Sequence, residues 1–188
     1  MNEGETAEAI LALGADDQAA RVRGAAGLYD AGRDVALAAT AAWREDAELG
    51  ALLTGHATVG VAVLPETFER IRSANGSPGL ADVPPEQDAR EFELAFPGNI
   101  SLDILTTREP HGPGAIARFL DRRGEGIQQV EFPVTDVDRA TSILRERFSI
   151  QAVYPETRPG ANGTHVNFFL VAAPAAGKIL IELVGNES

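Results

Sequence analysis

The sequence contains no cysteine and little of several other residue types that carry chemistry. It has three histidines, two tyrosines, one tryptophan and one methionine in 188 residues. The absence of cysteine excludes disulfides, thiol nucleophiles and thiolate metal sites. No apolar run approaches the roughly 18–20 residues needed to cross a bilayer, and the acidic N-terminus is unlike a signal peptide. We therefore expect a soluble, cytoplasmic protein that does not interact with membranes.

Positive charge is also scarce. The chain has 16 Lys and Arg against 28 Asp and Glu, which gives a formal net charge of −12. This balance argues against a general nucleic-acid binder, which needs a basic surface. We expect a small molecule as the substrate or ligand. A polyanionic ligand such as a coenzyme A ester would require positive charge concentrated locally. The arginines that could supply it are Arg70, Arg72, Arg118, Arg122 and Arg123.

From about residue 57 the chain repeats one pattern of elements. An alternating strand at 58–63 is followed by a helix starting at Pro65, and a strand from Gly126 is followed by a helix that Asp136 or Thr135 could cap. Each half ends in a further strand, at 100–105 and at 179–184. A repeat of this length predicts two duplicated βαβββ modules, at about 57–107 and 126–186.

The predicted strands carry isolated polar residues. Alternation places Val130 and Phe132 on one face of the 126–134 strand, and Gln129, Glu131 and Ile127 on the other. Polar residues stand among apolar ones at four mid-strand positions related by the repeat, namely Thr58, Asp103, Gln129 and Glu182. With the apolar faces packed on helices, the polar faces would curve around a shared cleft.

The remaining elements follow from local signals. An alternating strand at 90–96, a hairpin turn at 97–99, a helix at 115–123 and a short strand near 150–154 complete the domain of residues 53–188. Residues 1–52 are rich in alanine, and we expect two or three short helices separated by glycines, the last at about 34–49. This extension would pack on the main domain or on a second subunit, or bind a partner.

Four segments resemble one known superfamily. They are Ile-Ala-Arg-Phe-Leu-Asp-Arg-Arg-Gly-Glu-Gly-Ile at 116–127, Val-Pro-Pro-Glu-Gln-Asp at 83–88, Arg-Pro-Gly-Ala-Asn-Gly at 158–163 and Ile-Leu-Ile-Glu-Leu at 179–183. In this order they are similar to the vicinal-oxygen-chelate (glyoxalase/bleomycin-resistance) superfamily and, within it, to methylmalonyl-CoA epimerases. The resemblance implies an α+β fold in which two βαβββ modules form a curved mixed sheet around a cleft. It also implies a homodimer.

The resemblance also implies a divalent metal held by one side chain from each of four strands, usually including two histidines. Carried over to this chain, the ligands would be Thr58, Asp103, Gln129 and Glu182, with Thr58 and Gln129 in place of the histidines. Hydroxyl and amide oxygens are poor ligands for zinc-like metals, and an oxygen-only set suits Mg or Mn better. We expect Mg, Mn or Co as the metal, or no metal at all.

The family pattern places the acid and base roles of an epimerase on Glu86 and Glu182. Glu131 is an additional carboxylate on the polar face, and burial could make it a base that needs no metal. Gln129, Asn162 and His165 are candidates for substrate contacts.

Three functions remain open. The first is an isomerase or lyase that abstracts a proton next to the carbonyl of an acyl thioester or oxo-acid. The second is a metal-free protein that sequesters a small molecule, as resistance proteins of the superfamily do. The third is a metal-free biosynthetic cyclase or isomerase that uses carboxylates alone.

Overall fold

A single curved sheet connects the two predicted modules. The computed structural model describes residues 1–173 and 177–186, so residues 174–176 and 187–188 of the expected domain lie outside it. The sheet has seven strands in the order β2-β3-β1-β4-β7-β6-β5. Their bounds are β1 (Thr58–Ala62), β2 (Ala89–Phe96), β3 (Ile100–Thr107), β4 (Gly126–Pro133), β5 (Arg158–Pro159), β6 (Thr164–Ala173) and β7 (Gly177–Asn186).

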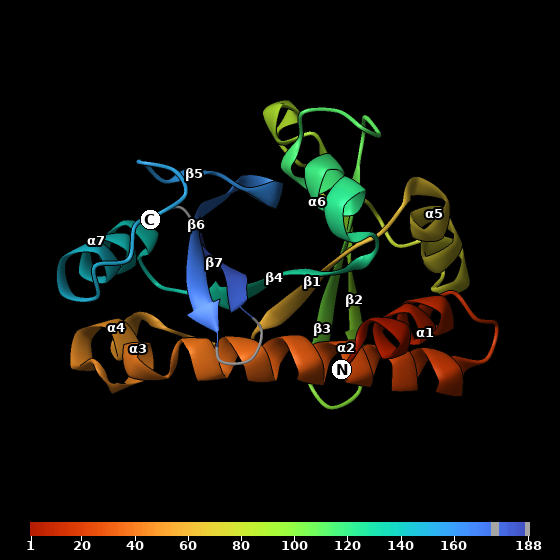
Figure 1. The fold of residues 1–188 in the computed structure, drawn as a ribbon, viewed down its shortest axis with the longest axis horizontal. Coiled ribbons are helices and arrows are strands. Elements are labelled where there is room, and N and C mark those ends of the chain that lie inside the picture. The colour runs from red at the N-terminus through yellow and green to blue at the C-terminus, as the bar shows by residue number, and fades with distance from the viewer. Residues whose placement is uncertain (174–176, 187–188) are drawn as a thin grey trace.

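The repeat is visible in the strand pairing. β1 pairs in parallel with β3, and β4 pairs in parallel with β7, while β1 and β4 run antiparallel where the modules meet. In Figure 1 the strands curl around one side of the molecule, with helices outside them. The α+β fold with a curved mixed sheet is therefore confirmed.

The helices of the two modules begin where the sequence predicts. They are α5 (Pro65–Ala74), α6 (Ala115–Arg123) and α7 (Val137–Arg147). Pro65 occupies the first turn of α5, and the Asp136 side chain accepts a 2.8 Å hydrogen bond from the backbone N–H of Arg139 at the start of α7. Asp136, and not Thr135, is therefore the cap. Two short 3₁₀ turns, η1 (Pro85–Gln87) and η2 (Ala161–Gly163), shape the loops.

The structure differs from the prediction in one strand of the second module and in the number of strands of the first. The segment near 150–154 makes only an isolated bridge, between Ala152 and Phe169, and the regular pairing begins at β5. The first module has three strands within the described residues, because residues 78–85 contain three prolines. Proline cannot donate to a strand ladder, and this segment bonds to β2 only through Ala81, whose N–H donates to the carbonyl of Glu91.

Four helices precede the sheet: α1 (Glu3–Leu13), α2 (Gln18–Ala39), α3 (Ala41–Glu45) and α4 (Ala47–Leu52). None of the helices in the described part of the chain is long and apolar enough to cross a membrane. The prediction that glycines separate short helices is wrong, because Gly24, Gly27 and Gly32 lie inside α2. A Cβ on Gly32 would stand 2.7 Å from Cγ1 of Val59, so this glycine lets α2 approach the sheet. The expected helix at 34–49 is instead interrupted at Thr40 and Asp46.

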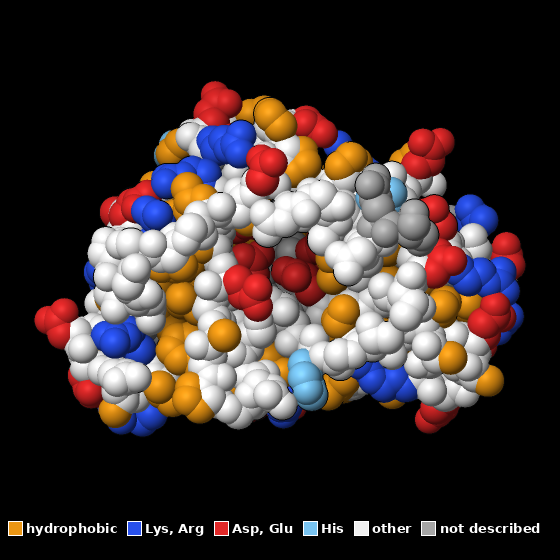
Figure 2. All heavy atoms as spheres, turned by 180° about the vertical axis from the view of Figure 1, so that it is seen from behind, with side chains coloured by type: hydrophobic (Ala, Val, Ile, Leu, Met, Phe, Trp, Pro, Cys, Tyr) orange, Lys and Arg blue, Asp and Glu red, His pale blue; other side chains and the backbone are white. Residues whose placement is uncertain are grey.

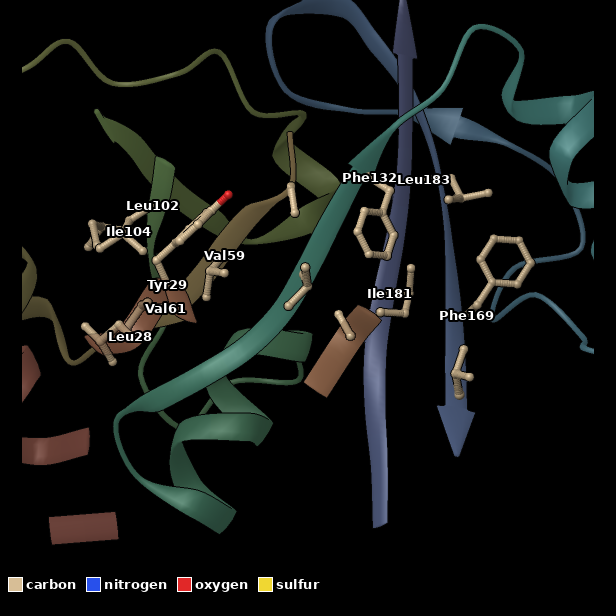
Figure 3. Close-up of a cluster of buried hydrophobic side chains, with 14 of the residues drawn as sticks. Leu28, Tyr29, Val59, Val61, Leu102, Ile104, Phe132, Phe169, Ile181 and Leu183 are labelled. Atoms are coloured by element: carbon tan, nitrogen blue, oxygen red, sulfur yellow. The ribbon is translucent and has the colours of Figure 1, made fainter. Parts of the chain in front are cut away.

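Helix α2 crosses the molecule along one face of the sheet and contacts β1, β3, β4, β6 and β7 (Figure 1). The apolar strand residues point toward this side. Figure 3 shows Leu28 and Tyr29 of α2 beside Val59, with Phe132 and Ile181 further along the same layer. These side chains belong to one buried cluster that joins both modules and the N-terminal helices. The opposite strand faces, which carry the polar residues, are left to form the cleft.

Candidate functional site

The polar faces of the strands line a cavity of about 680 Å³. Figure 2 shows this hollow from behind, with acidic side chains gathered inside it. Both modules contribute to the lining, as predicted for a shared cleft. Of the candidate site residues, Thr58, Glu86, Asp103, Gln129, Glu131, Asn162 and Glu182 line the cavity.

Strand pairing brings the carboxylates together in pairs. Glu131 on β4 lies directly opposite Glu182 on β7, and Asp103 on β3 lies opposite Glu93 on β2. Glu91 stands two residues before Glu93 on β2, on the same face of the strand, and it also lines this cavity. Five carboxyl groups from four strands therefore share one hollow.

Gly60 of β1 lies between the carboxylates of β2 and β3 and those of β4 and β7. It pairs with Asp103 on one side and with Gln129 on the other. A Cβ on Gly60 would stand 2.6 Å from Cγ of Gln129, which is closer than real contacts allow. The glycine therefore makes room for the Gln129 side chain on the cleft floor.

A β-bulge corrects the predicted face of Ile127. The β1–β4 register shifts between Gly60, which pairs with Gln129, and Val61, which pairs with Ile127. Gln128 is the extra residue, and bulges of this kind redirect side chains. Gln128 consequently joins the cavity lining, whereas Ile127 packs against the hydrophobic core near Gly32. Ile127 does not share a face with Gln129 and Glu131 as predicted.

Gln129 is the central hydrogen-bond donor of the cleft floor. Its Nε2 donates to Oε2 of Glu182 at 2.5 Å and, more weakly, to Oε1 of Glu131 at 3.4 Å. The N–H groups of the amide face these carboxyl oxygens, which act as acceptors. The hydroxyl of Thr58 donates instead to Ser101 at 3.4 Å, and the Ser101 hydroxyl donates to Glu93 at 2.6 Å.

The clustered carboxyl groups hold their protons more tightly than usual. Burial, together with the nearby Glu91, raises the pKa of Glu131 to about 7. Burial also raises the pKa of Glu91 to about 7. The pKa values of Asp103 and Glu182 lie well above their usual range, first because of burial and then because of neighbouring carboxylates. The raised pKa values of Asp103 and Glu182 favour their protonated forms, in which a carboxyl group can donate a hydrogen bond.

These contacts do not fit the four-ligand metal site that the family resemblance implies. Gln129 turns its N–H toward Glu182, and a donor facing a carboxylate is not placed as a ligand to the same metal. Thr58 is directed toward Ser101, on the side of the cleft away from Glu182. Within residues 1–173 and 177–186, no three His, Cys, Asp or Glu side chains are grouped to hold a metal ion. The predicted metal site at Thr58, Asp103, Gln129 and Glu182 remains a prediction.

The other predicted site residues lie at the edge of the cleft. Glu86 is exposed on the rim, in η1. The Asn162 side chain accepts a 2.9 Å hydrogen bond from the backbone N–H of Asp82, which fastens the rim loops of the two modules together. His165 pairs with Pro159 and Gly185 in the sheet and is absent from the cavity lining described. The substrate contact of His165 remains a prediction.

Sequence reasoning missed the role of Glu91 and Glu93. The alternation of β2 with Phe92 and Leu94 does predict that both glutamates share a polar face. It does not reveal that this face borders the cleft, because β2 and β3 pair at the edge of the sheet.

Of the comparisons with known proteins, the one with solved structures gives matches. No protein-family model matches the sequence, and no curated protein does. Among solved structures, the chain is similar to methylmalonyl-CoA epimerase from Mycobacterium tuberculosis, with 32% identity over 73% of this chain and 91% of that chain and a TM-score of 0.59. A Streptomyces coelicolor methylmalonyl-CoA epimerase in complex with 2-nitronate-propionyl-CoA matches with 25% identity over 72% and 99% of the two chains and a TM-score of 0.54.

A third structure, a methylmalonyl-CoA epimerase in complex with methylmalonyl-CoA and NH4+, shares the fold, with 24% identity over 73% and 96% of the chains and a TM-score of 0.52. In each case the alignment spans nearly all of the relative and leaves about a quarter of this chain unmatched. The M. tuberculosis protein is 32% identical to this chain over most of both chains. This similarity agrees with the strand order and the shared cleft of the structure. The chain belongs to the methylmalonyl-CoA epimerase family of the vicinal-oxygen-chelate superfamily.

Proposed function

We propose that this protein is an epimerase or isomerase that removes and returns the proton next to the carbonyl of an acyl thioester. The observation that carries the proposal is the arrangement of carboxyl groups around one cavity, with Glu131 on its floor and Glu86 on its rim. Epimerisation needs a group on each side of the reacting carbon, one to take the proton and one to supply it. Relatives in complex with 2-nitronate-propionyl-CoA and methylmalonyl-CoA support the thioester as substrate class.

Glu131 is the proposed base. A base works best when its pKa lies near the working pH, and the pKa of Glu131 is about 7. Gln129 contacts it through a weak hydrogen bond of 3.4 Å, which leaves the carboxylate free to take a proton. Glu86, on the rim, supplies the proton from the opposite side.

Asp103 and Glu182 stabilise the enolate that forms when the proton leaves. Their raised pKa values favour the protonated form, and a protonated carboxyl group donates a hydrogen bond to the thioester oxygen as it becomes negative. Gln129 donates to Oε2 of Glu182, so Oε1 remains for the substrate. Donors that are in place before the reaction lower its barrier without further rearrangement.

The cavity wall accommodates the acyl chain. Phe92, Leu105 and Phe168 provide apolar surface, and Arg118 and Arg158 are the basic residues in the described lining. A volume of about 680 Å³ lies within the usual range for small-molecule sites. Short 2-substituted acyl groups, with or without a second carboxylate, are the substrates to test.

The test is interconversion of the two epimers of methylmalonyl-CoA and of 2-methylbutanoyl-CoA, followed by chiral chromatography. Glu131→Gln removes the base without changing its shape and should lower kcat at least about 100-fold. The matched control is Glu66→Gln, an exposed glutamate on α5, which should leave kcat unchanged. Binding of both esters with no interconversion would favour sequestration instead. Full activity in Glu131→Gln would overturn the proposed role of this residue.

A further inference from the structure

A second cavity, of about 580 Å³, lies beside the N-terminal helices. Thr6 of α1 and Gly32 and Val35 of α2 form one side of it. Helix α6 and the beginning of β7 form the other side. The share of the chain that the epimerase structures leave unmatched is close to the share that α1–α4 occupy.

The charged side chains that line this cavity are positive, whereas the chain as a whole is negative. Arg118, Arg122, Arg123 and Lys178 line it, and no Asp or Glu appears among the described lining residues. The whole chain, in contrast, carries a net charge of −12. Such a local concentration of positive charge is what an anionic ligand requires.

In the part of the chain that the structure describes, these basic side chains lack the acidic partners that other arginines have, although Arg118 donates to the backbone carbonyl of Pro113. Arg139 and Arg147 on α7 are paired with Glu48, and Arg90 is paired with Glu69 at 2.7 Å. Within the described residues, Arg122, Arg123 and Lys178 take part in no ion pair. Four basic groups along one cavity with no acid among the described lining residues create a positive local potential that attracts an anion.

The second cavity shares a wall with the carboxylate cavity. Ala115, Arg118, Gln128 and Leu180 line both. The bulge in β4 places Gln128 at this boundary, and its side-chain Oε1 is buried with no hydrogen-bond partner among the described residues. A ligand that extends from one cavity into the other and carries N–H groups can donate a hydrogen bond to this unpaired oxygen.

We infer that this cavity binds the phosphate-bearing nucleotide end of the acyl thioester, while the acyl end occupies the carboxylate cavity. The inference rests on the proposed function, since it assumes a coenzyme A ester as substrate. Guanidinium groups match phosphate oxygens in pairs, and Phe119 and Ile179 add apolar surface for the rest of the nucleotide. The N-terminal helices are then part of the substrate site.

The experiment measures binding of coenzyme A, adenosine 3′,5′-bisphosphate and pantetheine by calorimetry. In the Arg122→Gln/Arg123→Gln variant, the Kd for coenzyme A and for the bisphosphate should rise at least about tenfold, since hydrogen bonds between charged groups are among the strongest. The Kd for pantetheine, which lacks phosphate, should not change. Arg145→Gln, an exposed arginine on α7, is the matched control and should bind all three ligands normally.

A second readout separates this inference from the proposed function. For an acyl-CoA substrate, the double variant should raise KM and leave kcat unchanged, and an acyl-pantetheine substrate should show no difference. Normal KM and Kd values in the double variant, or no binding of coenzyme A by the unchanged protein, would overturn the phosphate site. Binding that follows the expected pattern without any turnover would support the phosphate site and overturn the proposed epimerase.

Discussion

At the scale of single residues, the cleft concentrates carboxyl groups around one amide. Gln129 donates to Glu182 and Glu131, and Gly60 beside it leaves the space that its side chain fills. Burial raises the pKa values of Asp103, Glu131 and Glu182, and the negative charge of neighbouring carboxylates raises them further. At the same pH, the folded state therefore binds protons on these groups that the unfolded chain releases.

Glu131 should make stability fall with rising pH. Its pKa is about 7 in the folded protein and about 4.5 in its ordinary state, so the folded state binds more protons between these values and stability decreases as pH rises. From pH 5 to pH 8 we expect the unchanged protein to lose at least about 1 kcal/mol through this group. For a chain of this size that corresponds to about 2–4 °C in Tm. Glu131→Gln should flatten the decline in a thermal-shift series, and an unaltered slope would contradict the assignment.

Gly60→Ala should disturb the cleft floor. The added methyl group would meet Cγ of Gln129 at 2.6 Å, and overpacking of this kind costs about 1–3 kcal/mol. We expect a lower Tm and a lower kcat. The double variant Gly60→Ala/Gln129→Ala removes the collision and should regain most of the lost stability but not the activity. A single variant with unchanged Tm would show that Gln129 does not occupy this space.

At the scale of elements, much of the fold follows from the sequence. Alternation at Val130 and Phe132 and the proline at the start of α5 are local signals, and they give the strands and helices of both modules. The bulge at Gln128 could not be predicted, because one inserted residue leaves the apolar pattern nearly unchanged while reversing the face of Ile127. The glycines of α2 were misread for a related reason. Gly32 allows a close approach to Val59, which is distant in the sequence, and helix propensity describes only local effects.

Gly32→Ala therefore should destabilise the protein although alanine favours helices. Its Cβ would meet both methyl groups of Val59, at 2.7 and 3.0 Å. Gly27→Ala in the same helix is the matched control, since its Cβ would have only the Met1 sulfur nearby, at 4.0 Å. The control should be neutral or gain about 0.5–1 kcal/mol from helix propensity. Chemical unfolding measures both, and equal effects of the two substitutions would contradict close packing of α2 on β1.

At the scale of the whole molecule, the N-terminal helices and the sheet share one hydrophobic core. Leu28 of α2 and Trp43 of α3 are fully or almost fully buried with residues from both modules. The sequence suggested an extension that packs on the domain, but it contained no sign that α2 covers the seam between the modules. The expected homodimer remains a prediction, which light scattering would check.

Removal of residues 1–52 should abolish cooperative folding. The truncated chain would expose the apolar face that α2 covers on β1, β3, β4, β6 and β7, and large exposed apolar surfaces lead to aggregation. We expect no sharp thermal transition by circular dichroism. A truncated chain that melts cooperatively near the Tm of the full protein would show that residues 53–188 fold independently.

The most direct test of the central claim is solvent-deuterium incorporation at carbon 2 of methylmalonyl-CoA, measured by mass spectrometry in the presence of EDTA. Removal and return of a proton by carboxyl groups predicts rapid incorporation with EDTA present and at least about 100-fold slower incorporation in Glu131→Gln. Incorporation that stops with EDTA and returns with an added divalent metal would contradict catalysis by carboxyl groups alone. No incorporation under any condition would contradict the proposed epimerase.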